Sequence, residues 1–397
     1  MTAMNSLERK AIGALAGIFA LRMLGLFMIL PVFAIYANQL NHVTPSLVGV
    51  ALGVYGLTQA LLQIPFGFAS DRFGRKPMII LGLLLFCFGS MAAALSDSIY
   101  GVILGRSLQG ASAIGCVIMA LAADLTRDAV RVRAMAMIGI TIGLSFALAM
   151  VLGPILSEWY GVTGIFWLTA GLAGVAILLL LIWVPTPRTI KFNQEVSPHL
   201  SLIPRIFKQP ELNSLTLGVF VLHASLVALF LKIPLYIQAL GFVTGQSWRF
   251  YVPVLLGSLL AAIPALSIME RKDRVKSGLT LAWITLAIAE WGIGIFLDST
   301  LGFAFSVGLF FTAFNILEAS LPSLVSRIAP TGTRGTALGL YSSAQFLGLF
   351  LGGVIGGWLD ASYGMVGILL FCIILAVIWL IVDFIVNFKR GLPWQEG

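Results

Sequence analysis

The chain of 397 residues is 59% hydrophobic and only 10% charged, with a net charge of +8. A soluble domain has about 25% charged residues, so this composition excludes a soluble fold and predicts an all-α membrane protein. The length suits about a dozen helices of roughly 20–25 residues each. The basic residues lie in short connectors between apolar runs, a pattern that favours a lipid bilayer over a nucleic acid as the partner.

Twelve apolar runs follow one another along the chain. The first begins after Arg9 and Lys10 and is too long for the core of a signal peptide. We predict helices at about 11–37, 47–70, 78–96, 99–125, 133–157, 163–184, 212–237, 249–269, 278–297, 301–328, 334–359 and 364–388. A polar stretch at 185–210 contains five prolines. It predicts two six-helix bundles, 1–185 and 212–397, joined by a cytoplasmic linker at 186–211.

The charges in the connectors alternate in sign along the chain. If the N terminus is cytoplasmic, the basic connectors share that side, namely Arg72, Arg75, Lys76, Arg127, Arg131, Arg133, Arg188, Lys191, Arg271, Lys272, Arg274, Lys276, Arg327, Arg334, Lys389 and Arg390. The opposite connectors hold Asp97, Glu158, Asp298 and Asp360, with Arg249 at one helix start. This asymmetry predicts that both termini are cytoplasmic.

The connector 67–77, GFASDRFGRKP, is dense in glycine and charge. Gly67 and Gly74 allow close backbone approach or positive φ. Its charged residues are Asp71, Arg72, Arg75 and Lys76. The pattern G-x-x-x-D-R-x-G-R-K resembles the loop between helices two and three of major facilitator superfamily transporters. The resemblance implies the major facilitator fold, with twelve transmembrane helices in two six-helix bundles and a substrate site between them.

The same resemblance implies a gate at this connector. The positive end of the helix that begins near Arg334 would attract Asp71. Asp124, at the inner end of the 99–125 run, would pair with Arg75 or Arg72. The alternative for these charges is a solvated loop pair that contributes little.

Two further motifs resemble superfamily signatures. The R-x-x-Q-G pattern that starts at Arg106 implies a role in proton coupling, whereas the alternative is an arginine that reaches the headgroups. Gly139, Gly143, Gly153 and Pro154 resemble the signature of the antiporter branch, whose members are mostly exporters. Small residues four apart also let helices pack closely, here and in the glycine-rich run 334–359.

Charges at membrane depth are costly and therefore suggest function. They are Arg22, Lys232, Glu290 and Glu318, together with Arg106. A carboxylate in low-dielectric surroundings binds and releases protons nearer to neutral pH than one in water. Glu318 is our first candidate for a proton site, and Arg22 should face a cavity or a carboxylate. Lys232 and Glu290 either pair with each other across helices or face headgroups.

A substrate cavity has weaker candidates. They are Gln59, Gln63, Phe146, His223, Tyr341 and Gln345, each of which is more often a packing residue. The sequence lacks the G-x-x-x-x-G-K-[ST] phosphate loop, and its three cysteines lack metal-like spacing. We therefore expect no cofactor, no metal and no enzyme activity, with an ion or substrate gradient as the energy source.

Three stretches, RMLG at 22–25, SFALAMVLGP at 145–154 and FNILEASLPS at 314–323, resemble the bacterial YajR-type branch of the superfamily. This implies a monomeric inner-membrane exporter that exchanges protons for drug-like or amphipathic molecules. Members can carry a soluble domain after the last helix, which we expect to be absent or removed here. Two alternatives remain open, namely a symporter or facilitator that imports a polar solute, and a membrane sensor or interaction protein without transport.

Overall fold

The computed structural model describes residues 4–186, 203–271, 274–330 and 333–390. Most of the linker, 187–202, lies outside the described residues, as does Lys272. The regular structure of the described residues is helical. The N half comprises α1 (Ser6–Phe27), α2 (Leu30–Ala37), α3 (Pro45–Phe73), α4 (Arg75–Ala94), α5 (Ile99–Gly110), α6 (Gly115–Asp124) and α7 (Asp128–Trp183). The C half follows a short α8 (Ile203–Phe207) and comprises α9 (Pro210–Phe230), α10 (Ile233–Ala239), η2 (Thr244–Gln246), α11 (Trp248–Arg271), α12 (Val275–Ile295), α13 (Thr300–Ile328) and α14 (Arg334–Arg390).

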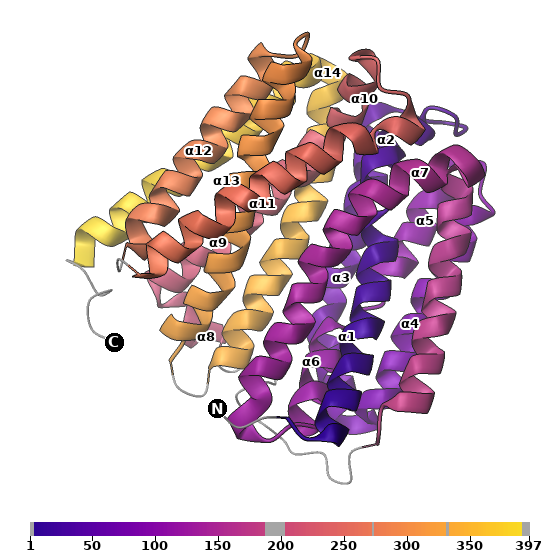
Figure 1. Ribbon diagram of the computed structural model, residues 1–397, viewed down its shortest axis with the longest axis vertical. Coiled ribbons are helices and arrows are strands. Elements are labelled where there is room, and N and C mark those ends of the chain that lie inside the picture. Colours follow the sequence, from indigo (N-terminus) through magenta and orange to yellow (C-terminus); the bar gives the residue numbers. More distant parts are fainter. Residues whose placement is uncertain (1–3, 187–202, 272–273, 331–332, 391–397) are drawn as a thin grey trace.

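Two helices bend sharply at a glycine. α7 has 56 residues and α14 has 57, and their non-helical residues are Gly161 (φ 66°) and Gly364 (φ 59°). Glycine suits both places because positive φ is costly for other residues. Figure 1 shows α7 crossing the molecule on a slant, turning at the top and descending at the edge of the N half, with other helices of that half between its two arms. Among the described residues ten helical stretches are long and apolar enough to span a membrane, and these two are about twice the length of a single crossing. The total of twelve crossings stays a prediction.

Three of the predicted runs are broken helices. The 11–37 run divides into α1 and α2, and the 212–237 run divides into α9 and α10. Pro31 and Pro234 stand in the first turn of α2 and α10, where a proline cannot continue the preceding helix. The 99–125 run divides into α5 and α6, with the chain between them turning at Ala111 to Ile114. Each break leaves backbone groups that need other partners inside the membrane.

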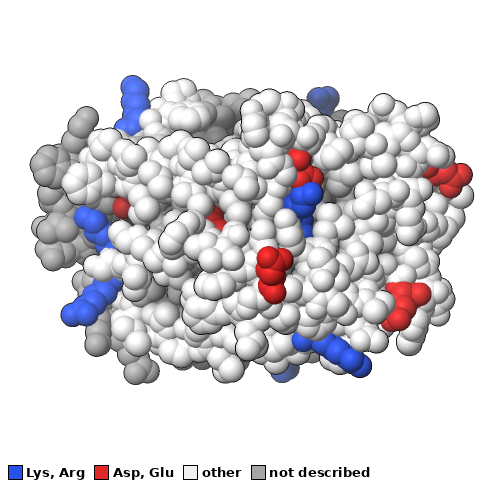
Figure 2. Space-filling view, turned by 90° about the horizontal axis from the view of Figure 1, so that it is seen from above, with Lys and Arg blue, Asp and Glu red and all other residues white. Residues whose placement is uncertain are grey.

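The halves lie side by side, the N half indigo to magenta and the C half red to yellow in Figure 1. We call the end that holds Gly74 the basic face, and the opposite end, with Asp97 and Asp298, the acidic face. Figure 2 looks onto the acidic face, where charges are few and scattered over a mostly uncharged surface. One apolar core cluster fills the C half and continues into the N half near the acidic face, and a second lies within the N half. In the C half Trp283 and Trp379 stack with ring centroids 4.4 Å apart.

Glycines bring α3 and α14 into backbone contact across the halves. A Cβ added at Gly53 would lie 2.7 Å from the carbonyl oxygen of Phe350, and one at Gly49 would overlap the carbonyl oxygen of Gly353. Because α3 begins near the acidic face at Pro45, this α3–α14 seam is closed toward that face. The tight packing predicted for the 334–359 run is therefore confirmed.

Candidate functional site

Three polar side chains from three helices of the C half meet inside the bundle. The Gln345 amide Nε2 on α14 lies 3.3 Å from Oε1 of Glu318 on α13 and 2.8 Å from Nε2 of His223 on α9. The second Glu318 oxygen lies 3.8 Å from the same imidazole nitrogen. His223 Nδ1 lies 3.1 Å from the carbonyl oxygen of Val219, so a neutral ring donates there and accepts from Gln345. A proton added at Nε2 would instead face the carboxylate.

The cluster is open on the Glu318 side. The Glu318 side chain is 33% exposed although it lies far from either end of α13. Tyr341 of α14, which interacts electrostatically with Glu318, is buried, and its hydroxyl has no hydrogen-bond partner among the described residues. The ring of Phe314 packs 5.6 Å from that of His223. The structure thus brings together Glu318, His223, Gln345 and Tyr341, which were separate candidates in the sequence.

Arg22 of α1 is enclosed in the N half, with 2% of its surface exposed. Its Nη2 donates to the Tyr55 hydroxyl (2.7 Å), to Gln59 Oε1 (2.9 Å) and to the carbonyl oxygen of Ser112 (3.0 Å). The expectation that Arg22 faces a carboxylate is wrong in this conformation, because its acceptors are neutral. It does not face an open cavity either, since almost all of its surface is buried. Ser112 lies in the break between α5 and α6, so Arg22 satisfies a carbonyl that the broken helix leaves open. Tyr55 and Ser112 were missed because 33 and 90 residues separate them from Arg22.

Arg106 of α5 is also buried and does not reach the headgroups. Its guanidinium donates to the carbonyl oxygens of Ala51 (3.2 Å) and Leu52 (3.3 Å) on α3 and to Gln109 Oε1 (3.2 Å). Its central carbon lies 5.4 Å from the ring of Tyr55. This arginine ties α5 to α3 through backbone groups, while its charge has no carboxylate partner among the described residues.

Lys232 and Glu290 do not pair with each other, which corrects the sequence expectation. Lys232, at the break between α9 and α10, lies 2.8 Å from Oδ1 of Asp360 on α14. Glu290 of α12 is fully buried between α9 and α14, near Ser225 and Cys372. Neither of its oxygens has a hydrogen-bond partner among the described residues. The sequence assigned Asp360 to a connector and so gave no reason to match it with Lys232.

Arg75 is the centre of the charged network at the basic face. Its guanidinium lies 2.5 Å from Oδ1 of Asp71 and 3.3 Å from Oδ2 of Asp124, and it donates to Ser70 Oγ. The expected pairing of Asp124 with Arg75 is therefore present. Gly74 has φ of 98°, a value that favours glycine and lets α4 begin at Arg75 itself. The network ties the ends of α3, α4 and α6 together.

Other residues of the connector have lesser contacts. Arg72 lies over the ring of Phe73, with 5.6 Å from its central carbon to the ring centroid. The carbonyl oxygen of Gly67 accepts from the Ser70 hydroxyl at 2.7 Å, and Lys76 is partly exposed. The attraction of Asp71 to the start of α14 stays a prediction, because here Asp71 is paired within the N half.

A second ion pair at the basic face was not foreseen. Arg127 Nε donates to Glu8 Oε1 at 2.9 Å, which raises the pKa of the guanidinium. Glu8 also closes a capping box with Asn5 at the start of α1. The N-S-L-E pattern of that box is a local signal that could have marked Glu8. The pair fastens the start of α1 to the connector before α7.

The antiporter-like glycines divide into two kinds. Gly153 approaches the carbonyl oxygen of Met28 beside Pro154 in α7, so it does permit close packing. Gly139 and Gly143 have no neighbouring atom within 4 Å of an added Cβ. The expectation that they serve close packing is wrong in this conformation.

Two further cavity candidates, Phe146 and Gln63, make contacts with residues other than Glu318. The ring of Phe146 lies 5.2 Å from that of Phe27 and 5.8 Å from that of Phe311 of the C half, measured between centroids. The carbonyl oxygen of Gln63 accepts from the Cys116 thiol.

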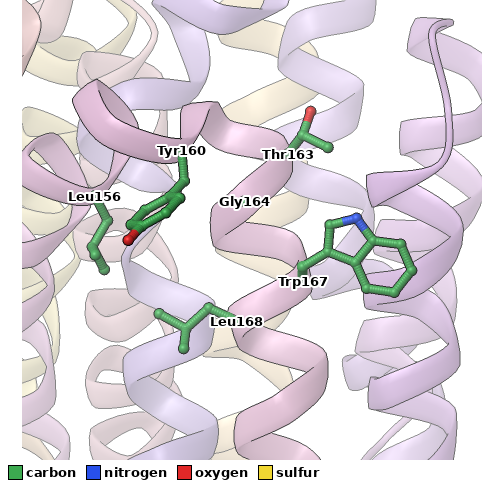
Figure 3. Close-up of a pocket in the computed structure, with 6 residues that line it drawn as sticks. All are labelled: Leu156, Tyr160, Thr163, Gly164, Trp167 and Leu168. Atoms are coloured by element: carbon green, nitrogen blue, oxygen red, sulfur yellow. The ribbon is translucent and has the colours of Figure 1, made fainter.

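An apolar hollow of about 480 Å³ lies at the bend of α7. Figure 3 shows its lining residues, Leu156, Tyr160, Thr163, Gly164, Trp167 and Leu168. No group of metal-ligating side chains occurs among the described residues.

An all-helical chain of two halves, with charged clusters inside each, defines a polytopic membrane protein of the transporter class. The family model of the Major Facilitator Superfamily matches residues 15–267, and the chain belongs to this superfamily. It is 42% identical over 377 residues to the inner membrane transport protein YajR of Escherichia coli K12, which covers 94% of this chain and 83% of that protein. It is 28% identical over 342 residues to the multidrug resistance protein MdtH of Aeromonas hydrophila, covering 84% of this chain and 82% of that protein.

Solved structures show the same fold. A bacterial homologue of the human lysosomal transporter Spinster, crystallised in an inward-facing and unoccupied conformation, superposes with a TM-score of 0.80 at 15% identity, covering 98% of this chain and all of that chain. The nucleoside transporter NupG superposes with a TM-score of 0.74 at 14% identity, covering 96% of this chain and all of that chain. The chain is thus a multi-pass inner-membrane transporter of the major facilitator type.

Proposed function

We propose that this transporter is a proton-coupled exporter, an antiporter of amphipathic small molecules that works by alternating access. It acts as a monomer in a bacterial inner membrane, with both termini in the cytoplasm, and uses the proton gradient without a cofactor. The observation that carries the proposal is the Glu318 side chain, which is one-third exposed and whose carboxylate is held by Gln345 beside His223. A group that exchanges a proton for a substrate must be accessible from the space that the substrate enters.

Accessibility separates the two carboxylates at membrane depth. Glu318 is one-third exposed, whereas Glu290 is sealed inside the C half. A proton on Glu290 could exchange only after the packing of α9, α12 and α14 had opened. We therefore assign the transported proton to Glu318, with His223 as the adjacent group that receives it or stabilises its departure.

The buried arginines support a coupled mechanism in the N half. Arg106 binds backbone carbonyls of α3, the helix that forms the closed seam with α14. A change in charge near the α3–α14 seam would therefore act on α3, a helix whose contact with α14 must change during alternating access. The multidrug resistance proteins among the relatives support amphipathic molecules as the substrate class.

The test uses purified protein in liposomes that contain a pH-sensitive dye. A proton gradient is imposed, and a panel of lipophilic cations and other amphipathic solutes is added. We expect substrate-triggered proton movement opposite to the substrate, and its loss in Glu318→Gln. The matched control is Glu290→Gln, which makes the same change at the sealed carboxylate and should retain flux.

Three results would revise the proposal. Flux that survives in Glu318→Gln and is lost in Glu290→Gln would move the proton site to Glu290. Proton movement in the same direction as the solute would make the protein a symporter. A transporter that moves substrate without any proton movement would be a facilitator.

A further inference from the structure

The first arm of α14 packs along α9 in a row of close contacts that repeats once per turn. An added Cβ on any of three α14 glycines would meet α9 at 3.0 Å or less. In chain order the facing residues are Gly348 with Phe220, Gly352 with Ala224, and Gly356 with Ala228. Both sets of numbers rise in steps of four, so the two helices run parallel and each step is about one turn. We call this row the α9–α14 zipper.

An ion pair occupies the next step of the zipper. Asp360 follows Gly356 by four residues, and Lys232 follows Ala228 by four. Lys232 Nζ lies 2.8 Å from Asp360 Oδ1, at the break where α9 ends and α10 begins. Three glycine contacts therefore lead to one ion pair at the end of the row nearest the acidic face.

The glycines hold the two helices close but do not fix one helix along the other. Because the row repeats every four residues, a shift of α14 by one turn, about 5.4 Å, would place each glycine opposite another position of similar shape. Shifts of one turn are a known form of movement between packed elements. The residues one turn before the ion pair, Ala228 and Gly356, carry no charge. The ion pair therefore distinguishes the observed register from the shifted one, as a single polar position does in a coiled coil.

The polar cluster depends on the same register. His223 lies on α9 directly before Ala224, and Gln345 lies on α14 three residues before Gly348. The Gln345 amide nitrogen lies 2.8 Å from His223 Nε2 across the two helices, and 3.3 Å from Oε1 of Glu318 on α13. A shift of one turn would move Gln345 by about 5.4 Å and break both contacts.

From this arrangement we propose that Lys232 and Asp360 are a positioning pair for the polar cluster. By setting the register of the α9–α14 zipper, the pair keeps the Gln345 amide between His223 and Glu318. The inference rests on the proposed role of Glu318 in proton exchange, and it names the residues that keep the surroundings of that carboxylate assembled. The pair carries no transported proton and acts through the two helices that it joins.

The first test uses a metal ion to report the register and needs no substrate. Gln345→His places a second imidazole beside His223 and Glu318, which completes a three-ligand set of the kind that Zn²⁺ takes in open sites. His223 suits this role, because its Nδ1 lies 3.1 Å from the carbonyl oxygen of Val219 and can donate there, which leaves Nε2 to bind the metal. The Zn²⁺ affinity of the purified protein is measured by competition with a fluorescent zinc indicator.

We expect Gln345→His to bind Zn²⁺ more tightly than the wild-type protein does. Adding Lys232→Met should weaken that binding about 10- to 100-fold, the loss that follows when groups orienting metal ligands are removed. Exchange of the two charges, Lys232→Asp with Asp360→Lys, should restore the affinity. Lys232→Met with Asp360→Leu leaves no charge unpaired but also no preferred register, so it should not restore the affinity.

Two further variants support the interpretation. Asp360→Asn keeps the shape of the side chain and removes its charge, so it should weaken Zn²⁺ binding as Lys232→Met does. Arg127→Met is the matched control, because it removes the ion pair with Glu8 in the N half and should leave the Zn²⁺ affinity unchanged.

Three results would overturn the positioning role. An unchanged Zn²⁺ affinity after Lys232→Met would show that the register does not depend on the pair. Equal recovery by the apolar double variant and by the charge exchange would show that the pair only fills space. Zn²⁺ binding by Gln345→His that is no tighter than that of the wild-type protein would mean that the cluster is not held together at this register.

The second test measures proton flux in liposomes. Lys232→Met should lower the substrate-triggered flux, and the charge exchange should restore it. Normal flux in Lys232→Met, with weakened Zn²⁺ binding, would show that the register does not matter for proton exchange. If the wild-type protein moves no protons for any compound, the proposed function loses support, while the Zn²⁺ affinities still decide whether the pair sets the register.

Discussion

Single side chains show how this fold holds charge inside a membrane. Arg22 and Arg106 are buried among neutral acceptors, whereas Lys232 is neutralised by Asp360 across two helices. A buried charge without hydrogen bonds would be far too costly, so the partners determine whether the charge can be kept. The arginines therefore have structural roles in addition to any role in coupling.

We expect Arg22→Met to destabilise the N half. The change leaves the Tyr55 hydroxyl, Gln59 and the Ser112 carbonyl without their donor, and each unsatisfied buried group costs about 1–3 kcal/mol. Thermal unfolding of the purified protein in detergent should show a lower midpoint. Arg9→Met, at an exposed position near the start of α1, is the control and should leave the midpoint unchanged. An equal midpoint for both variants would mean that the hydrogen bonds of Arg22 do not support the α5–α6 break.

The Lys232–Asp360 pair gives a second expectation. Lys232→Met leaves the Asp360 carboxylate, 11% exposed, without its counter-charge. Breaking a fully buried ion pair costs about 3–5 kcal/mol. The loss of stability here should be smaller, because the lysine side chain is 25% exposed. The double variant Lys232→Met, Asp360→Leu should recover much of the thermal stability. A double variant less stable than Lys232→Met alone would show that Asp360 has another partner.

Elements, rather than residues, decide how the halves meet. α3 and α14 approach so closely near the acidic face that only glycine fits at several positions. On α7, by contrast, Gly139 and Gly143 have open space where a Cβ would lie. The same residue type therefore permits a close approach of two helices in one place and meets open space in another.

We expect Gly53→Ala to open the acidic face. The new Cβ would lie 2.7 Å from the carbonyl oxygen of Phe350, which is a steric clash. The conformation in which the α3–α14 seam is closed should therefore become less populated. Spin labels at Asp97→Cys and Asp298→Cys, one in each half, should report a longer distance. Gly139→Ala, which meets open space, serves as the control. A distance distribution equal to that of the control would mean that α3 relaxes without moving the halves apart.

The whole molecule is organised by the sidedness of its charges and by the two long bent helices. If α7 crosses the membrane twice and the basic face is cytoplasmic, Glu158 near its bend lies on the far side of the inner membrane, and both ends of the helix lie in the cytoplasm. The same argument places the bend of α14 outside, and it gives twelve crossings.

We expect a membrane-impermeant maleimide to label Glu158→Cys and Ser299→Cys in intact cells and to leave Ser6→Cys unlabelled until the membrane is opened. The charge asymmetry predicts this orientation. Labelling of Ser6→Cys in intact cells would reverse the orientation. Protection of Glu158→Cys, with Ser299→Cys labelled, would instead show that the bend of α7 lies within the membrane and would lower the number of crossings.

The helices and the family were accessible from the sequence because membrane spans and charged connectors are local signals. Apolar runs mark the spans, and the G-x-x-x-D-R-x-G-R-K connector marks the superfamily. The partner of Asp124 could also be narrowed to Arg75 or Arg72 by the family resemblance, since both arginines belong to the same motif. The partners of Arg22 and Lys232 could not, because the residues that face a buried charge lie on other helices, at separations that no local pattern encodes.

The sequence by itself therefore determined that this is a multi-pass membrane protein that resembles the major facilitator superfamily, and which charges lie at membrane depth. Only the tertiary structure decided which of those charges meet. It joined Glu318 to His223 and Gln345, sealed Glu290 in the C half, matched Lys232 with Asp360, and left Gly139 and Gly143 of α7 open while glycines of α3 closed on α14. The physical reason is that hydropathy follows from each segment alone, whereas the contacts of a side chain depend on how separate helices are rotated and packed against one another.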